Sequence, residues 1–187
     1  MKTYTLQVAG LTRELPIIPI SDQLSIASFV ILGDTELVVK TAQVMADKLP
    51  SVDVLVTAEA KGIPFVYELS KQMGMDRYIV ARKSIKAYMN DPMTHAVHSI
   101  TTQSEQQIVL DGADAAFIKG KKVALIDDVI STGQSLLALE RLVEKAGGIV
   151  TVKAAILAEG EAAERDDIVY LEPLPLFPND AAVDAKS

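Results

Sequence analysis

Apolar and polar positions along this chain form patterns typical of strands and of helices in turn. Short apolar runs predict strands at residues 4–8, 14–20, 52–57, 77–81, 123–126, 149–157 and 168–171. Helical spacing predicts helices from Asp34 or Thr35 to residue 49, at residues 63–73 and at residues 132–145. Because strands and helices alternate, the pattern predicts an α/β protein with a parallel sheet.

The segment from residue 82 to about residue 107 breaks this pattern. It is polar, with Asn90-Asp91-Pro92 as a turn, and we expect a hairpin or a mobile loop, with a strand at residues 97–101. In parallel sheets, ligands bind beyond the carboxyl ends of the strands. The candidate functional segments are therefore residues 57–62, 82–86 and 127–135.

Composition and charge limit the class of protein. The chain has 187 residues, enough for one domain with a sizeable core, and its net charge of −7 argues against nucleic-acid binding. It has no cysteine, which excludes disulfides and thiolate metal sites and suits a reducing cytosol. It has neither an apolar run long enough for a membrane helix nor the apolar region of a signal peptide. We therefore expect a soluble, cytoplasmic protein.

One motif carries the strongest chemical signal. An apolar run leads into Asp127 and Asp128, and a loop of small and hydroxylated residues then opens a predicted helix, with the sequence Val129, Ile130, Ser131, Thr132, Gly133, Gln134 and Ser135. Free N–H groups and the partial positive charge of a helix N-terminus favour a phosphate. Two adjacent carboxylates suit the vicinal hydroxyls of the same ligand. The motif predicts a sugar-phosphate site.

Two other interpretations of the motif were considered. The two aspartates could only cap a turn, with Thr132 as a helix N-cap. A two-component receiver domain also has paired aspartates after its first strand, but it needs more chain than follows Asp128 here.

The motif resembles the signature of type I phosphoribosyltransferases that binds 5-phosphoribosyl pyrophosphate (PRPP), and the likeness is greatest to the adenine group. The resemblance covers nearly the whole chain. It implies a parallel sheet flanked by helices, with a small hood from about residues 1–33 and 158–187 on a single domain. It also implies that Asp127 and Asp128, the catalytic candidates, hold the ribose hydroxyls of PRPP, while residues 131–135 bind its 5′-phosphate.

Two further segments carry the resemblance. Glu59-Ala60-Lys61-Gly62 is similar to the pyrophosphate loop of the family, in which an arginine usually stands where Lys61 does, and a cis peptide is implied between Ala60 and Lys61. Taken alone, this segment also suits an ordinary turn. Arg82 and Lys83, with Lys86 close behind, are implied to bind pyrophosphate; alone, they suit a solvated charge cluster.

The sequences of the predicted lid and hood give information on which base is bound. Residues 86–107 match the flexible loop of the family, but Ser99-Ile100-Thr101-Thr102-Gln103-Ser104 lacks the glutamate usual in adenine enzymes, and Glu105 only lies nearby. Phe29 and Glu159 fall in segments that bind the base in the family, although Phe29 suits a core position equally. His95 and His98 have no third ligand in view, so no protein metal site is expected.

Together these features predict an enzyme that transfers phosphoribosyl from PRPP to a purine base in salvage, with adenine favoured. Mg²⁺ is the implied cofactor, bound mainly by water and substrate. The implied partners are PRPP, the base and a second copy in a homodimer, without nucleic acid or membrane. A catalytically silent PRPP-binding regulator and a xanthine or other-purine enzyme stay open. A purine repressor is opposed by the acidic charge and by the early position of the phosphate motif.

Overall fold

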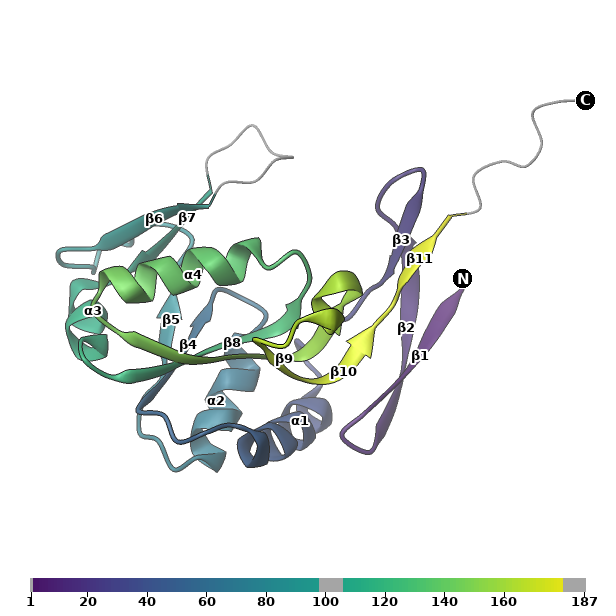
Figure 1. The fold of residues 1–187 in the computed structure, drawn as a ribbon, viewed down its shortest axis with the longest axis horizontal. Helices are drawn as coiled ribbons and strands as arrows, with labels where there is room; N and C mark the ends of the chain where they lie inside the picture. The colour runs from purple at the N-terminus through teal and green to yellow at the C-terminus, as the bar shows by residue number, and fades with distance from the viewer. Residues whose placement is uncertain (1, 98–105, 180–187) are drawn as a thin grey trace, which may run out of the picture.

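The computed structural model describes residues 2–97 and 106–179, and its centre is a five-stranded sheet (Figure 1). The strand order is β10-β9-β8-β4-β5, and all four neighbouring pairs are parallel. The strands are β4 (Val54–Ala58), β5 (Ile79–Ala81), β8 (Lys122–Ile130), β9 (Ile149–Glu159) and β10 (Val169–Leu174). The predicted α/β class with a parallel sheet is confirmed.

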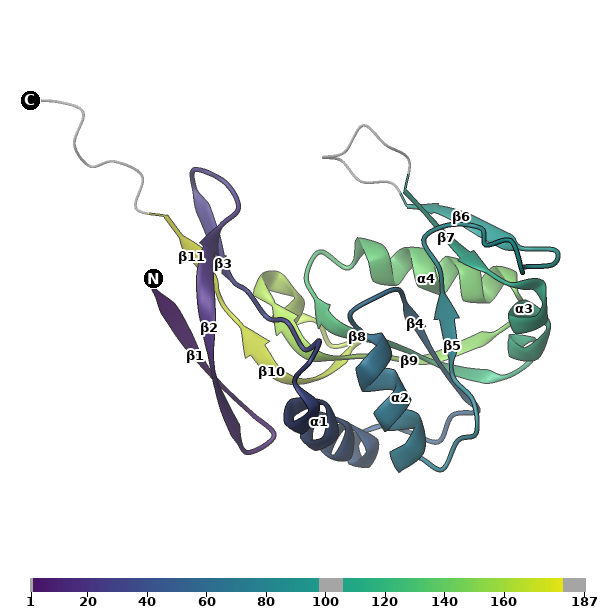
Figure 2. The same ribbon diagram turned by 180° about the vertical axis from the view of Figure 1, so that it is seen from behind.

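Helices cover both faces of this sheet, as both views show (Figures 1 and 2). The first pair is α1 (Thr35–Lys48) and α2 (Ile63–Gln72), and the second pair is α3 (Gly112–Ile118) and α4 (Gln134–Lys145). Alternate side chains of β8 point to opposite faces of the sheet. Ala124 and Ile126 pack in the cluster that contains α1 and α2, whereas Val123 and Leu125 pack with α3 and α4. This period of two is what buries the strand on both sides.

The two ends of the chain form a second sheet beside β10 (Figures 1 and 2). Its antiparallel order is β1-β2-β3-β11, with the strands β1 (Thr3–Val8), β2 (Leu11–Pro19), β3 (Leu24–Ala27) and β11 (Leu176–Pro178). Strands β3 and β11 were not predicted. They form because the two strands hydrogen-bond to each other, although about 150 residues separate them in sequence. A local sequence pattern does not indicate such a pairing.

A hairpin made of β6 (Met93–Val97) and β7 (Gln106–Leu110) lies along α4. Lys145 Nζ donates a hydrogen bond to the Thr94 carbonyl oxygen at 3.2 Å, and Arg82 and Val109 exchange two backbone hydrogen bonds of 2.8 Å. The hairpin is one of the two forms predicted for this segment. The predicted strand beyond Val97, His98, the lid residues 99–104 and Glu105 lie outside the described residues.

Candidate active site

Asp127 and Asp128 lie within β8 rather than after it. The predicted strand ended at residue 126, but β8 continues to Ile130 because β9 pairs with it as far as Ala158. The side chain of Ile130 is buried in the core, so of the two apolar residues predicted at the PRPP site only Val129 lines the cavity described below. The longer strand holds both carboxylates on rigid backbone.

The two carboxylates differ in their surroundings. Asp128 is 3% exposed, and its Oδ2 atom has no hydrogen-bond partner among the residues that the structure describes. The Lys61 ammonium lies 3.4 Å from that oxygen. Asp127 Oδ1 accepts the Asp128 N–H at 2.8 Å. Burial, followed by the negative charge of Asp128, raises the pKa of Asp127 to about 8. Without a cationic or hydrogen-donating ligand, this pair of carboxylates is therefore electrostatically unsatisfied.

The segment after β4 reaches the carboxylates closely. A Cβ atom at Gly62 would lie 2.5 Å from Thr57 Oγ1 and 3.7 Å from Asp127 Oδ1, so only glycine allows this approach. The cis peptide bond joins Glu59 and Ala60, not Ala60 and Lys61, and the prediction was wrong by one position. The Glu59 N–H donates to the carbonyl oxygen of Ala81 in β5 at 2.9 Å, which holds Glu59 beside that strand. The chain turns immediately after Glu59.

The predicted cationic cluster divides into two parts. Lys83 lines the cavity, whereas the Arg82 guanidinium pairs with Glu59, with 3.0 Å between Nε and Oε2, and donates to the Tyr88 hydroxyl at 2.6 Å. The hydrogen bond from Arg82 lowers the pKa of Glu59. Lys86 Nζ donates to Ser84 Oγ at 2.7 Å. In this conformation, Arg82 and Lys86 are held outside the cavity.

A cavity of about 590 Å³ joins these segments at the carboxyl edge of the sheet. Its lining residues come from the β4 loop, the β5 loop, the hairpin, β8 and α4: Ala58, Glu59, Ala60, Lys61, Lys83, Val97, Gln107, Ile108, Asp127, Asp128, Val129 and Ser135. The hairpin residues were not predicted as lining. The apolar residues 108–110 could have indicated a strand. No local pattern, however, indicated that this strand would line the cavity.

The predicted phosphate loop connects β8 to α4. Ser131 and Thr132 are exposed, and Gly133 has a φ of +79°, a conformation that favours glycine. The helix begins at Gln134, two residues later than predicted, because the left-handed turn at Gly133 precedes it. The first turn of α4 contains no acidic residue, and only a long hydrogen bond of 3.4 Å joins the Gln134 N–H to Thr132 Oγ1, so the helix start and its partial positive charge are available to an anion.

The two candidate base-binding residues lie in different surroundings. Phe29 is 5% exposed and packs in the apolar cluster that also contains Leu6 and Val8 of the second sheet, outside the cavity lining. Glu159 is the last residue of β9, at the same sheet edge as the carboxylates, and burial raises its pKa while the nearby charge of Lys61 opposes that rise. Glu159 thus lies within reach of the charge of Lys61 but, like Phe29, is not among the residues that line the cavity, so its role in binding the base stays a prediction.

A magnesium ion is compatible with these residues only in one manner. Among residues 2–97 and 106–179, no three His, Cys, Asp or Glu side chains group as a metal cage. The Asp128 Oδ2 atom is a buried anionic acceptor without a hydrogen-bond partner in the same part of the chain, next to Asp127. Mg²⁺ typically keeps several waters and takes one or two carboxylates plus substrate oxygens. The site fits that mode of binding.

A family model described as the phosphoribosyl transferase domain matches residues 39–186. The chain belongs to this family. The membership predicted from the motifs is thus confirmed. Within the described residues, no helix has the length and apolar character needed to span a membrane.

Sequence relatives agree with this membership. A hypoxanthine/guanine phosphoribosyltransferase of Methanotorris igneus is 32% identical over 143 residues, which is 76% of this chain and 72% of that protein. Another, of Ferroglobus placidus, is 36% identical over 114 residues, 61% of this chain and 57% of that protein. The chain therefore spans little more than half the length of some of its relatives.

Solved structures show the same fold at lower identity. An adenine phosphoribosyltransferase of Thermoanaerobacter pseudethanolicus superposes with a TM-score of 0.69 at 20% identity, covering 85% of this chain and 95% of that one. A purine phosphoribosyltransferase of Pyrococcus horikoshii has a TM-score of 0.53 at 20% identity, covering 72% and 81%. The chain has the type I phosphoribosyltransferase fold.

Proposed function

We propose that this protein is a purine phosphoribosyltransferase that transfers the 5-phosphoribosyl group of PRPP to a purine base and releases pyrophosphate. One observation carries the proposal: the cavity brings the carboxylates of Asp127 and Asp128 together with Lys61, Lys83 and the start of α4. PRPP carries hydroxyls, a pyrophosphate and a 5′-phosphate, and this arrangement offers a complementary group to each. The family membership and the names of the relatives support the same reaction.

Each part of the substrate then has its own binding residues. The ribose hydroxyls donate to Asp127 and Asp128, which supplies the missing partner of Asp128 Oδ2. The 5′-phosphate is held by backbone N–H groups of residues 131–135, with hydroxyls of Ser131, Thr132 and Ser135 beside them. Gln134, the first residue of α4, contributes its N–H, which here makes a long hydrogen bond of 3.4 Å to Thr132 Oγ1 that the phosphate would replace.

The leaving pyrophosphate is held by cationic groups that line the same cavity. Lys61 and Lys83 line the cavity, and their positive charges neutralise the negative charge of the pyrophosphate. Arg82 and Lys86 do not line the cavity, and Arg82 would reach the ligand only by exchanging its contact with Glu59. A bound Mg²⁺ would add charge neutralisation on the pyrophosphate, with Asp127 and Asp128 as the carboxylates available to hold it.

Catalysis by these residues rests on positioning and electrostatics. The bond from C1′ to the pyrophosphate oxygen breaks, a bond from C1′ to a base nitrogen forms, and the base loses a proton. Positive charge develops on the ribose ring during this exchange, and the carboxylates of Asp127 and Asp128, which hold the ribose hydroxyls, lie next to it. Lys61 and Lys83 stabilise the departing negative charge.

Among purines, the names of the sequence relatives favour hypoxanthine and guanine, while the solved structures named for adenine share only the fold. The preference for adenine expected from the sequence stays a prediction, as do the homodimer and the cytoplasmic location. A site that hydrogen-bonds one exocyclic group rejects the other strongly, because its own polar groups would be left unpaired. One class of purine should therefore dominate.

Pyrophosphate release with PRPP and Mg²⁺ tests the proposal across adenine, guanine, hypoxanthine, xanthine, orotate and uracil. We expect turnover with a purine, and its loss in the Asp127→Asn, Asp128→Asn double variant. Turnover only with orotate or uracil would contradict the purine assignment. PRPP binding without turnover of any base would identify a silent PRPP-binding protein, the alternative left open by the lid sequence.

A further inference from the structure

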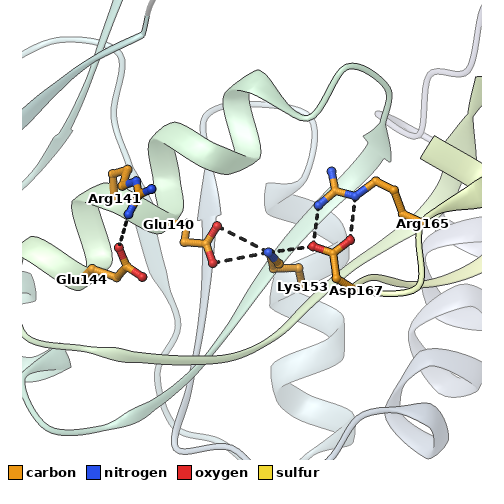
Figure 3. Close-up of polar contacts among 6 residues, drawn as sticks. All are labelled: Glu140, Arg141, Glu144, Lys153, Arg165 and Asp167. Atoms are coloured by element: carbon orange, nitrogen blue, oxygen red, sulfur yellow. Dashed lines mark hydrogen bonds and ion pairs between the residues drawn. The ribbon is translucent and has the colours of Figure 1, made fainter. Parts of the chain in front are cut away.

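Arg165 lies in a fixed position next to the phosphate loop. It follows η1 (Gly160–Glu164), the 3-10 turn after β9. Its Nε and Nη2 atoms donate to the two carboxylate oxygens of Asp167 at 2.8 and 2.7 Å, a bidentate pair (Figure 3). A guanidinium held by two parallel hydrogen bonds loses most of its rotational freedom.

The partner of Arg165 is itself anchored. Asp167 Oδ2 lies 2.9 Å from Lys153 Nζ, and that ammonium donates to Glu140 of α4 at 3.3 Å (Figure 3). Lys153 and Glu140 are mostly buried, with side chains 17% and 21% exposed. The chain of contacts therefore links α4, β9 and the turn before β10, and it fixes the guanidinium relative to the start of α4.

The third nitrogen of Arg165 faces the loop. Nη1 has no hydrogen-bond partner in the described part of the chain, although the other two nitrogens are both bonded. A Cβ atom built at Gly133 would lie only 2.6 Å from Nη1 and 3.9 Å from Cζ. Nη1 thus packs directly against the backbone at the turn that precedes α4. A side chain at position 133 would displace it.

We propose that Arg165 is a binding residue for the 5′-phosphate, with Nη1 donating a hydrogen bond to a phosphate oxygen held at residues 131–135. This rests on the proposed function and adds a side-chain donor to a site otherwise made of backbone N–H groups and hydroxyls. The two donors committed to Asp167 orient the guanidinium before the ligand binds. A pre-oriented donor binds with a smaller entropic penalty than a free side chain.

Two variants separate this role from a structural one. Arg165→Gln removes both the ion pair with Asp167 and the third donor. Arg165→Lys keeps a charge that can pair with Asp167 but cannot also present a nitrogen to the loop. The matched control is Arg141→Gln, which removes an arginine that lies on α4, pairs with Glu144 at 3.1 Å and is 59% exposed (Figure 3).

Calorimetry with ribose 5-phosphate, PRPP and pyrophosphate, each with Mg²⁺, tests the proposal, and ligand-free melting temperatures check folding. We expect both Arg165 variants to bind ribose 5-phosphate and PRPP about tenfold more weakly, as for loss of a charged hydrogen bond. Pyrophosphate binding should stay unchanged, and Arg141→Gln should match the wild type with all three ligands.

Three results would overturn the assignment. Wild-type affinity in Arg165→Lys with a loss in Arg165→Gln would show that the residue acts only through Asp167. An equal loss for pyrophosphate would show a general effect on the site. Unchanged ribose 5-phosphate binding in both variants of a protein that still binds PRPP would refute this inference and leave the proposed function intact. A wild-type protein that binds no PRPP would instead refute the proposed function.

Discussion

Replacing Asp128 with asparagine should stabilise the ligand-free protein and remove its response to PRPP. The Asp128 carboxylate is buried, and its Oδ2 atom has no hydrogen-bond partner among the described residues, while the Lys61 ammonium lies 3.4 Å away. Burial and the charge of Asp128 raise the pKa of the preceding Asp127 to about 8. The ligand-free fold therefore holds two carboxyls where the second negative charge is unfavourable.

The magnitude follows from the pKa of Asp127. Its folded value lies above the unfolded one, so the folded state binds the extra proton, and stability falls as pH rises from about 4 to about 8. At about 1.4 kcal/mol per pKa unit, this shift sets an upper limit of about 6 kcal/mol. Burial, the larger cause of the shift, persists in Asp128→Asn, so only the part due to the Asp128 charge is removed, and we expect this variant to gain about 1–3 kcal/mol at pH 8. The lost contact with the half-exposed Lys61 should cost less than about 1 kcal/mol.

Thermal unfolding with and without PRPP and Mg²⁺ measures both effects. The variant should melt above the wild type at pH 8, by less at pH 5, where Asp127 is protonated, and PRPP should raise only the wild-type midpoint. Asp166→Asn is the control, because it makes the same change in net charge at an exposed residue. An Asp128→Asn protein that melts below the wild type at pH 8, or that PRPP stabilises as strongly, would refute the reasoning.

Three further substitutions test the site and the hood. Gly62→Ala should lower stability by about 1–3 kcal/mol in urea unfolding, because its Cβ would lie 2.5 Å from buried Thr57 Oγ1; an unchanged midpoint would contradict that close approach. Lys83→Ala should weaken the binding of PRPP about tenfold and leave the binding of a nucleoside monophosphate almost unchanged in calorimetry. Equal losses of affinity for both ligands would show that Lys83 acts only through the overall electrostatic field of the site. Phe29→Ala should cost about 3–5 kcal/mol of stability, because the ring is 5% exposed. A higher KM for the base with no loss of stability would instead place the ring against the base.

Local sequence determined the features that depend on neighbours along the chain. The apolar runs at β4 and β8 are buried on both faces, so they were recognisable as strands without any knowledge of their partners. Asp34 was one of the two residues predicted to cap α1, beside Thr35, and its Oδ1 accepts the Leu37 N–H at 3.0 Å. The order of carboxylates, hydroxyls and helix start also predicted a sugar-phosphate site, and that site stays a prediction.

Some boundaries depended on strand partners that sequence does not reveal. β8 extends through Asp127 and Asp128 because β9 continues to supply hydrogen bonds to it. Strands β3 and β11 exist because the two ends of the chain meet, with Ser25 Oγ donating to Asn179 Oδ1 at 2.5 Å. Hydrogen-bond partners far apart in sequence leave no periodic signal in either segment.

Tertiary structure alone decided which charged side chains face the cavity. Arg82 and Lys83 are neighbours in sequence, but Glu59 holds the first away while the second lines the cavity. Arg165 carries no motif, and it lies against Gly133 only because the turn after β9 and the start of α4 meet at one edge of the sheet. Sequence determines which groups a chain can offer to a ligand. Packing decides which of these groups line the binding site, because ion pairs and close contacts depend on distances that only the folded backbone sets.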